Sequence, residues 1–226
     1  MEDVKKSLVV LFASLHLDEG TSPDFIKSYR DILREIAPSV ICAELSPEQL
    51  DGTTTCHSKP EYAAAVLPIA QELGSRIVPI QMPTDDAREW ERRLKSVYAS
   101  LEKDPEMRVC LEYMKEQGKA ELEGMLQIVG NPNGIEYFQT REYDILQVQP
   151  YYSALERIFP ELATLYEEWN YSFLKRIETA LADYRGEKFM IIVGGHHKYW
   201  LWDQLKRRDD IELHDLASYR LLQVID

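Results

Sequence analysis

Histidine and glutamate side chains follow three apolar runs of the chain, at the points where buried strands are expected to end. His16 follows the first run, Glu44 ends the second, and His196 and His197 follow a later one. Parallel sheets bind ligands beyond the carboxyl ends of their strands, so we expect these side chains to share a site. A neutral imidazole can act as a general base or bind a metal, and a carboxylate can assist in either role. The pattern therefore predicts a general-base or metal site.

Gly194 and Gly195 separate the later apolar run from its two histidines. Paired glycines let the backbone turn sharply and approach a ligand. The N–H groups at the start of the following helix can bind an anion or an oxyanion, and the helix dipole opposes protonation of a histidine placed there. The Gly-Gly-His-His segment is a weak motif on its own, because it lacks the serine of a nucleophile elbow and matches no nucleotide-binding loop.

Short apolar runs alternate with amphipathic helical patterns in the first third of the chain and again near its end. Strands are expected over residues 8–15, 39–45, 76–80, 188–193, 211–213 and 221–225. Helices are expected from Pro23 to just before Pro38, over 61–73 and over 199–208. This alternation predicts an α/β fold with a mostly parallel central sheet flanked by helices. Pro79 places the third strand near an edge of the sheet.

The middle of the chain, about 84–185, shows no convincing strand and has the breaks expected between several helices. We expect a large all-helical insert there, between the third and fourth strands of a single domain whose core covers about 1–83 and 186–226. The last helix of the insert is expected to begin at Trp169 and Asn170. Asn170 would then either cap that helix or take part in the site.

The charge balance argues against two classes of partner. The chain of 226 residues has 26 Lys and Arg against 39 Asp and Glu, a net charge of −13. Without clustered basic residues, binding to nucleic acid or to an anionic membrane is not expected. The first apolar run is too short to span a bilayer, and the scattered Cys42, Cys56 and Cys110 are expected to be reduced thiols. These features predict a cytoplasmic protein.

Other polar and aromatic residues are weaker candidates for the site. The polar loop that holds Cys56 and His57 could form a wall of the site, but a surface loop is the simpler interpretation. His214 follows a short expected strand and fits a local hydrogen bond. Four tyrosines of the insert either line a pocket or pack the insert itself: Tyr137, Tyr143, Tyr151 and Tyr152.

The order of these motifs resembles a superfamily that groups TraB-type pheromone-shutdown proteins, TIKI proteases, erythromycin-esterase-like enzymes and ChaN-like haem-binding proteins. Its first Gly-x-x-His motif is similar to residues 13–16 here, and its glutamate-bearing strand is similar to residues 38–45. Its second Gly-x-x-His motif is similar to residues 194–197, which makes His197 rather than His196 the family histidine.

The resemblance implies a site rather than one activity. The esterase-like members resemble metal-independent hydrolases, the TIKI-type members metal-dependent peptidases, and the ChaN-like members bind haem. Three positions depart from the family pattern. Ala13 replaces the first glycine, Trp169 stands before Asn170 where an arginine is usual, and Gln81 follows the third strand where relatives often carry an acid.

The leading hypothesis is a hydrolase of an ester or amide (peptide) bond in a small-molecule or peptide substrate. One histidine would deprotonate water, the carboxylate would orient an imidazole, and the glycine pair would stabilise the oxyanion. The candidate catalytic set is His16, Glu44, Asn170, His196 and His197. In a variant, His16, Glu44 and His197 bind a divalent ion such as Mn, Co or Zn, with water at the open position. The rivals are a protein that binds haem or another small ligand without turnover, and an interaction module built on the insert.

Overall fold

A computed structural model describes residues 5–14, 23–53, 59–129 and 134–225 of the chain. Within these residues, five strands form one sheet in the order β3-β2-β4-β1-β5, and every neighbouring pair is parallel. The strands are β1 (Ser7–Ser14), β2 (Val40–Ala43), β3 (Arg76–Pro79), β4 (Lys188–Gly194) and β5 (Ile211–His214). The expected parallel sheet is confirmed, and β3 lies at an edge, as its proline predicted.

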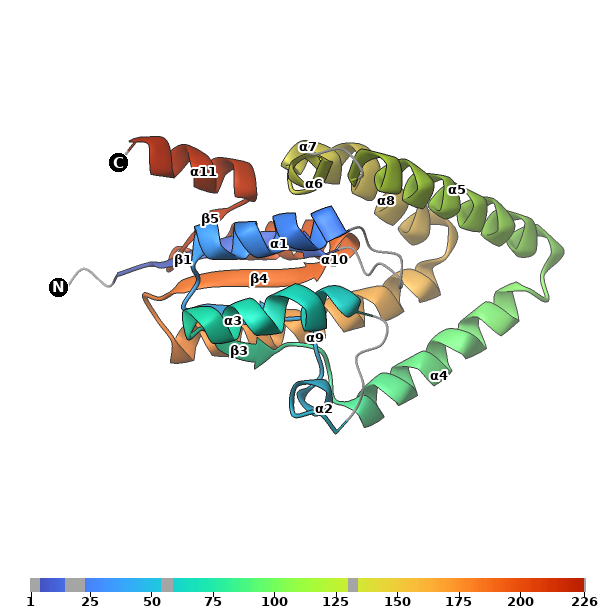
Figure 1. Ribbon diagram of the computed structural model, residues 1–226. Coiled ribbons are helices and arrows are strands. Elements are labelled where there is room, and N and C mark those ends of the chain that lie inside the picture. Colours follow the sequence, from blue (N-terminus) through green and yellow to red (C-terminus); the bar gives the residue numbers. More distant parts are fainter. Residues whose placement is uncertain (1–4, 15–22, 54–58, 130–133, 226) are drawn as a thin grey trace.

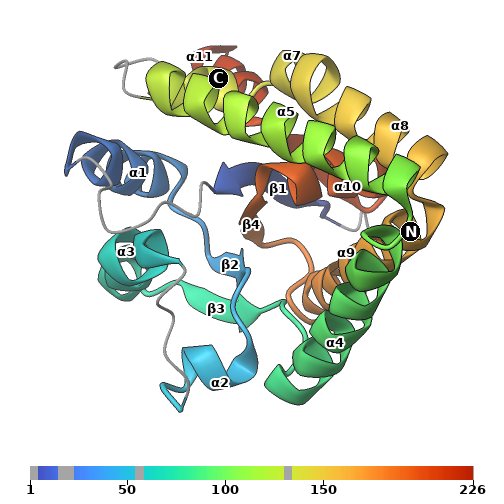
Figure 2. The same cartoon turned by 90° about the vertical axis from the view of Figure 1, so that its right-hand side faces the viewer.

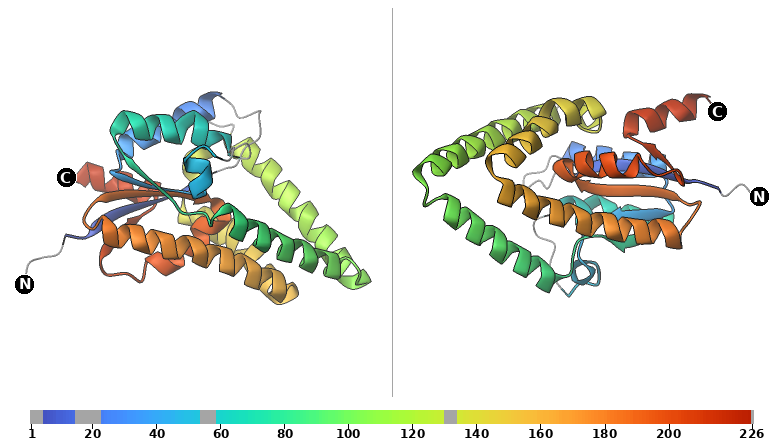
Figure 3. Two further views of the ribbon diagram at one scale, coloured as in Figure 1. Left: turned by 90° about the horizontal axis from the view of Figure 1, so that it is seen from below. Right: turned by 180° about the vertical axis from the view of Figure 1, so that it is seen from behind.

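Helices cover both faces of the sheet, which explains why its strands are continuously apolar rather than alternating. One face is covered by α1 (Pro23–Ile36), by a π-helical turn η1 (Tyr62–Val66) continuous with α3 (Leu67–Leu73), and by α11 (Leu216–Ile225). The other face is covered by α9 (Pro160–Asp183) and α10 (Gly195–Leu205). Figure 2 shows these two layers on either side of the strands, and Figure 3 shows α9 running the length of the sheet.

Three expectations about element boundaries are wrong. Residues 221–225 belong to helix α11, whose buried side chains recur at helical spacing against the sheet. Helix α9 begins at Pro160, so Trp169 and Asn170 lie inside the helix and Asn170 is not a cap. Helix α10 begins at Gly195, directly after β4, so both histidines lie in its first turn rather than before the helix.

Every regular element of the described residues between β3 and β4 is helical. The helical elements between these two strands are α4 (Thr84–Leu101), α5 (Pro105–Val129), α6 (Gly134–Phe138), α7 (Arg141–Tyr143), a π-helical turn η2 (Asp144–Val148), α8 (Gln149–Ile158) and α9. The short α2 (Pro47–Leu50) lies earlier in the chain, directly after β2. Helices α4, α5, α8 and the start of α9 share a small apolar core of their own around Leu111, Leu155 and Phe159. In Figure 1, α4 and α5 extend beyond the carboxyl ends of the strands.

The carboxyl ends of the central strands lie side by side, and this places the chemistry. Ser14 at the end of β1 pairs with Gly194 of β4, and Ala43 at the end of β2 pairs with Ile192. Residues that follow these strands therefore gather at one edge, which the insert helices frame in Figure 2. No helix in the described part of the chain has a stretch long and apolar enough to cross a membrane.

Candidate functional site

Glu44 lies just beyond β2 and is buried between a neighbouring strand and a lysine. The N–H of Gly194 at the end of β4 donates to its Oε2 at 2.8 Å. The ammonium of Lys59 donates to its Oε1 at 2.9 Å. The carboxylate thus joins the ends of two strands and holds the residue that caps helix α10.

Lys59 is also buried, only slightly less than its partner, and its charge is well satisfied. Besides the Glu44 carboxylate, its Nζ donates to the Glu44 carbonyl at 2.6 Å and to Oε1 of Gln81 at 2.8 Å. Gln81 follows β3, so the ammonium connects the ends of two strands. The sequence carried no signal for Lys59, because a lysine in a polar stretch is usually solvated.

His197 is held by a buried amide from the insert. Its Nδ1 lies 2.6 Å from Oδ1 of Asn170, which is fully buried in the middle of α9. The Asn170 Nδ2 donates to the Tyr152 hydroxyl at 3.2 Å, and this hydroxyl donates to the backbone carbonyl of His196 at 3.2 Å. Asn170 therefore holds the ring of His197 and does not cap its own helix.

This chain of hydrogen bonds determines which nitrogen of His197 carries the proton. A hydroxyl has one hydrogen, so Tyr152, which donates to a carbonyl, must accept from the amide nitrogen of Asn170. Burial raises the pKa of Tyr152 to about 12, so the hydroxyl keeps its hydrogen. The amide oxygen then faces the imidazole and requires a hydrogen on Nδ1. In the neutral ring, Nε2 carries the lone pair that can accept a proton.

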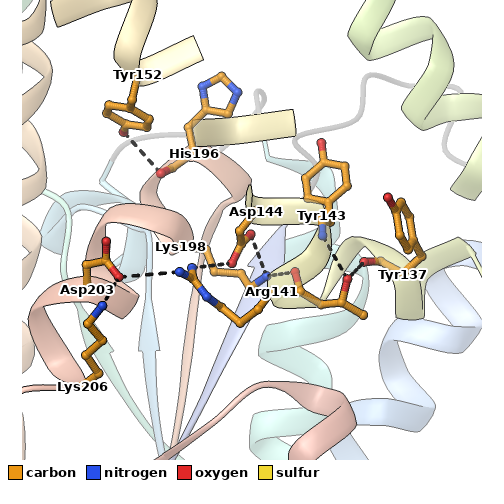
Figure 4. Close-up of polar contacts among 10 residues, drawn as sticks. Tyr137, Arg141, Tyr143, Asp144, Tyr152, His196, Lys198, Asp203 and Lys206 are labelled. Atoms are coloured by element: carbon orange, nitrogen blue, oxygen red, sulfur yellow. Dashed lines mark hydrogen bonds and ion pairs between the residues drawn. The ribbon is translucent and has the colours of Figure 1, made fainter. Parts of the chain in front are cut away.

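The two adjacent histidines have different surroundings. The ring of His197 packs edge-on against Phe173 of α9, with 5.0 Å between ring centroids. The ring of His196 instead packs against Tyr151 of α8 at 4.6 Å, and Figure 4 shows it on the side of Tyr152. The difference follows from helical geometry, because consecutive residues of a helix point in different directions.

The residue after the histidines, Lys198, is fully buried and fixes α10 to the insert. Its Nζ donates to Oδ1 of Asp144 in η2 at 3.0 Å, and Arg141 donates to Oδ2 of the same carboxylate at 3.0 Å (Figure 4). Burial raises the pKa of Asp144 and lowers that of Lys198, and the opposite charges offset each shift only in part. Neither residue was a sequence candidate, since their pairing joins positions 54 apart in the chain.

Two consecutive insert residues also touch the strand ends. A Cβ added to Gly195 would lie 3.0 Å from Cζ of Phe138, so a larger residue there would push this ring away by a few tenths of an ångström. The side chain of Gln139 donates to the Ala13 carbonyl at 3.0 Å and accepts from the Ala13 N–H at 2.6 Å. It thereby pairs with β1 beyond Val10, where β5 stops pairing. The insert therefore forms part of the carboxyl edge.

The structure thus brings Glu44, the two glycines, both histidines and Asn170 to one end of the sheet. His16, Cys56 and His57 lie outside the described residues. His214 is remote from this edge in the register of β5 and contacts Glu212 at 3.1 Å, which fits the local hydrogen bond expected for it.

Of the three residues predicted to bind a divalent metal, His16 lies outside the described residues, and the described donors alone do not form a metal site. Among the described residues, no group of three His, Cys, Asp or Glu side chains is arranged to hold a metal ion. Glu44 already accepts from an ammonium and from a backbone N–H, so a metal ion bound to it would lie beside the positive charge of Lys59.

Fold and site together define an α/β protein whose helical insert completes the carboxyl edge of a parallel sheet. Comparison of the chain with family models, curated proteins and solved structures gave no match. The superfamily resemblance therefore stays a prediction from three short motifs.

Proposed function

We propose that the protein hydrolyses an ester or amide bond, with His197 as the general base on water. The observation that carries this proposal is the 2.6 Å contact between His197 Nδ1 and the buried oxygen of Asn170. It supports a fixed ring with a basic Nε2. An imidazole whose second nitrogen is held by another group is the usual arrangement of a catalytic base.

The proposed reaction balances with water as the only co-reactant. Nε2 of His197 takes a proton from water while the water oxygen bonds to the carbonyl carbon of the substrate. The resulting oxyanion lies at the first turn of α10, which begins at Gly195 and whose N–H groups have no acceptor within the helix. When the tetrahedral intermediate collapses, the C–O or C–N bond breaks and the imidazolium returns its proton to the leaving group.

Glu44 has a positioning role in this proposal. Its carboxylate accepts a hydrogen bond from the N–H of Gly194. This N–H is therefore occupied, and the N–H groups that follow it in α10 would bind the oxyanion. The ammonium of Lys59 neutralises the carboxylate. This arrangement favours the metal-independent version of the mechanism.

The test compares matched histidine changes against a panel of p-nitrophenyl esters and amides. His197→Gln should lower kcat/KM by about 100- to 10,000-fold, the usual contribution of a general base. Asn170→Ala should lower it less, because the base stays but loses its orientation. His214→Gln makes the same change at a histidine of the edge strand and should leave activity unchanged. Activity that survives both His197→Gln and Asn170→Ala contradicts the proposal.

Two further measurements separate the rival functions. Elemental analysis of protein purified without chelator tests the metal version, because active metal-free protein excludes it. Titration with hemin tests the haem-binding alternative. A wild-type protein that cleaves nothing in the panel and shifts the absorption band of hemin would favour binding without turnover.

A further inference from the structure

A cleft of about 360 Å³ lies between α5 and the segment formed by η2 and α8. Its walls include Tyr113 and Met114 from α5, Leu146 from η2, and Pro150 and Tyr151 from α8. None of the described residues that line it is charged, although charged residues make up 29% of the chain. A charged ligand group would find no counter-charge on this described lining, and burying an unpaired charge is costly. The lining, which also includes Gln117 and Gln147, therefore suits a neutral and mainly apolar group.

The apolar surface of this cleft is exposed to water on both walls. Tyr113 on α5 leaves 62% of its surface exposed, and Leu146 on η2 leaves 55%. Large side chains exposed within a concavity are typical of binding sites. The volume lies at the lower end of the range for small-molecule pockets, which suits one aromatic group or an acyl chain of moderate length.

Tyr151 links the cleft to the histidine site. It lines the cleft, and its ring also packs against His196 at 4.6 Å, one residue before the proposed base. A ligand in the cleft would therefore lie one aromatic ring away from the first turn of α10.

We propose that this cleft binds the acyl chain or aromatic group of the substrate, which makes apolar esters or amides the preferred substrate class. The proposal rests on the proposed hydrolase function for its reaction. The cleft itself can be tested by binding alone, without turnover.

Two glycines of α5 provide a matched pair of variants. Gly118 lines the cleft, Gly124 does not belong to its described lining, and a Cβ added at either position meets nothing within 4 Å. Gly118→Trp should fill the cleft, whereas Gly124→Trp makes the same change on the same helix outside that lining. Neither change should unfold α5, because glycine is the poorer helix former.

The substrates are p-nitrophenyl octanoate and p-nitrophenyl acetate, and the binding probe is N-phenyl-1-naphthylamine, a neutral fluorescent molecule. Gly118→Trp should lower kcat/KM for the octanoate by about 10-fold or more and spare the acetate, since apolar pockets discriminate by such factors. It should also weaken binding of the probe, and Gly124→Trp should match the wild type in both assays.

The outcomes separate the cleft from the reaction. If the wild type cleaves neither ester but binds the probe, and only Gly118→Trp loses binding, the apolar cleft is supported and the hydrolase is not. If the esters are cleaved and Gly118→Trp changes neither the octanoate-to-acetate ratio nor probe binding, the cleft proposal is overturned and the hydrolase stands. An equal loss of octanoate hydrolysis or of probe binding in Gly118→Trp and Gly124→Trp also overturns the cleft proposal.

Discussion

Two lysine–carboxylate pairs are buried near the site, and they differ in how well the ammonium is satisfied. Lys59 donates to three oxygen atoms at 2.6 to 2.9 Å. Lys198 donates to Asp144 at 3.0 Å and reaches the Thr140 carbonyl only at 3.4 Å. The carboxylates differ in the charge of a second donor. Asp144 also accepts from the guanidinium of Arg141, whereas Glu44 also accepts from the uncharged N–H of Gly194.

The difference indicates two different roles. The pair of Lys59 and Glu44 joins strand ends of the core, and its hydrogen bonds compensate for the loss of hydration. The pair of Lys198 and Asp144 joins α10 to the insert, and burial shifts both pKa values toward the neutral forms. Such a pair contributes little net stability, and its value lies in specifying one arrangement. We therefore expect the first pair to stabilise the fold and the second to position the insert.

The largest effect is expected from Lys59→Met. The change leaves the Glu44 carboxylate buried without its ammonium, so the free energy of unfolding should fall by about 3–5 kcal/mol. Urea denaturation measures this. Lys27→Met removes an exposed pair with Asp31 and should leave the urea midpoint unchanged. A loss of less than about 1 kcal/mol in Lys59→Met would contradict the stabilising role, since breaking a buried pair costs more.

Lys198→Met should cost less, about 2 kcal/mol, because Arg141 still pairs with the Asp144 carboxylate. The same urea experiment decides the order of the two lysine variants. A loss equal to or greater than that of Lys59→Met would show that the two pairs do not differ as described. Arg141→Met in the Lys198→Met background should then add a further loss, because it removes the remaining cation.

A third buried ionisable group shows the effect of burial alone. Burial raises the pKa of the Cys42 thiol from 9.0 to about 12. Between these values the unfolded chain loses the proton and the folded protein keeps it, so stability falls as pH rises. From pH 8 to pH 10 this group should remove about 1.4 kcal/mol of the free energy of unfolding.

Cys42→Ala should abolish this group's share of the stability that is lost between pH 8 and pH 10, as measured by urea denaturation at both pH values. Cys110→Ala is the control, since this thiol on α5 is only half-buried, and it should retain the wild-type dependence on pH. If the free energy of unfolding depends on pH identically in Cys42→Ala and in the wild type, burial of this thiol without a partner charge costs less free energy than described here.

The smallest effect is expected when both partners of the second pair are replaced. Asp144→Leu combined with Lys198→Met should bring the free energy of unfolding to within about 1 kcal/mol of the wild type, because apolar residues can replace a buried pair at little cost. Ester hydrolysis should nevertheless be lower than in the wild type, since the insert loses its fixed position on α10. Restored stability together with wild-type activity would contradict the positioning role.

The sequence was sufficient for most of the sheet and for placing two candidate residues, Glu44 and His197, at its carboxyl edge. A continuous apolar run such as residues 189–193 can only be a buried strand or a buried helix, and its short length favoured a strand. The same ambiguity explains the error at 221–225, where an apolar segment without alternation folds as a helix. Glu44 and His197 were chosen as candidates because parallel strands bring their carboxyl ends together.

The residues that the sequence did not reveal depend on contacts between distant segments. Lys59, Asp144 and Lys198 are ordinary charged residues in local sequence, and only the fold buries them. Asn170 was expected at a helix start because asparagine favours caps. Its place in mid-helix is explained by partners 18 and 27 positions away, which no local pattern encodes.

The tautomer of His197 can be measured directly by long-range ¹H–¹⁵N correlation spectroscopy of the imidazole rings, with the signal assigned by its loss in His197→Gln. The hydrogen bonds through Asn170 and Tyr152 predict a neutral ring with hydrogen on Nδ1 and a basic Nε2. Asn170→Ala should remove that preference. A neutral His197 that carries its hydrogen on Nε2 in the wild type, or one that Asn170→Ala leaves unchanged, would contradict the proposed base.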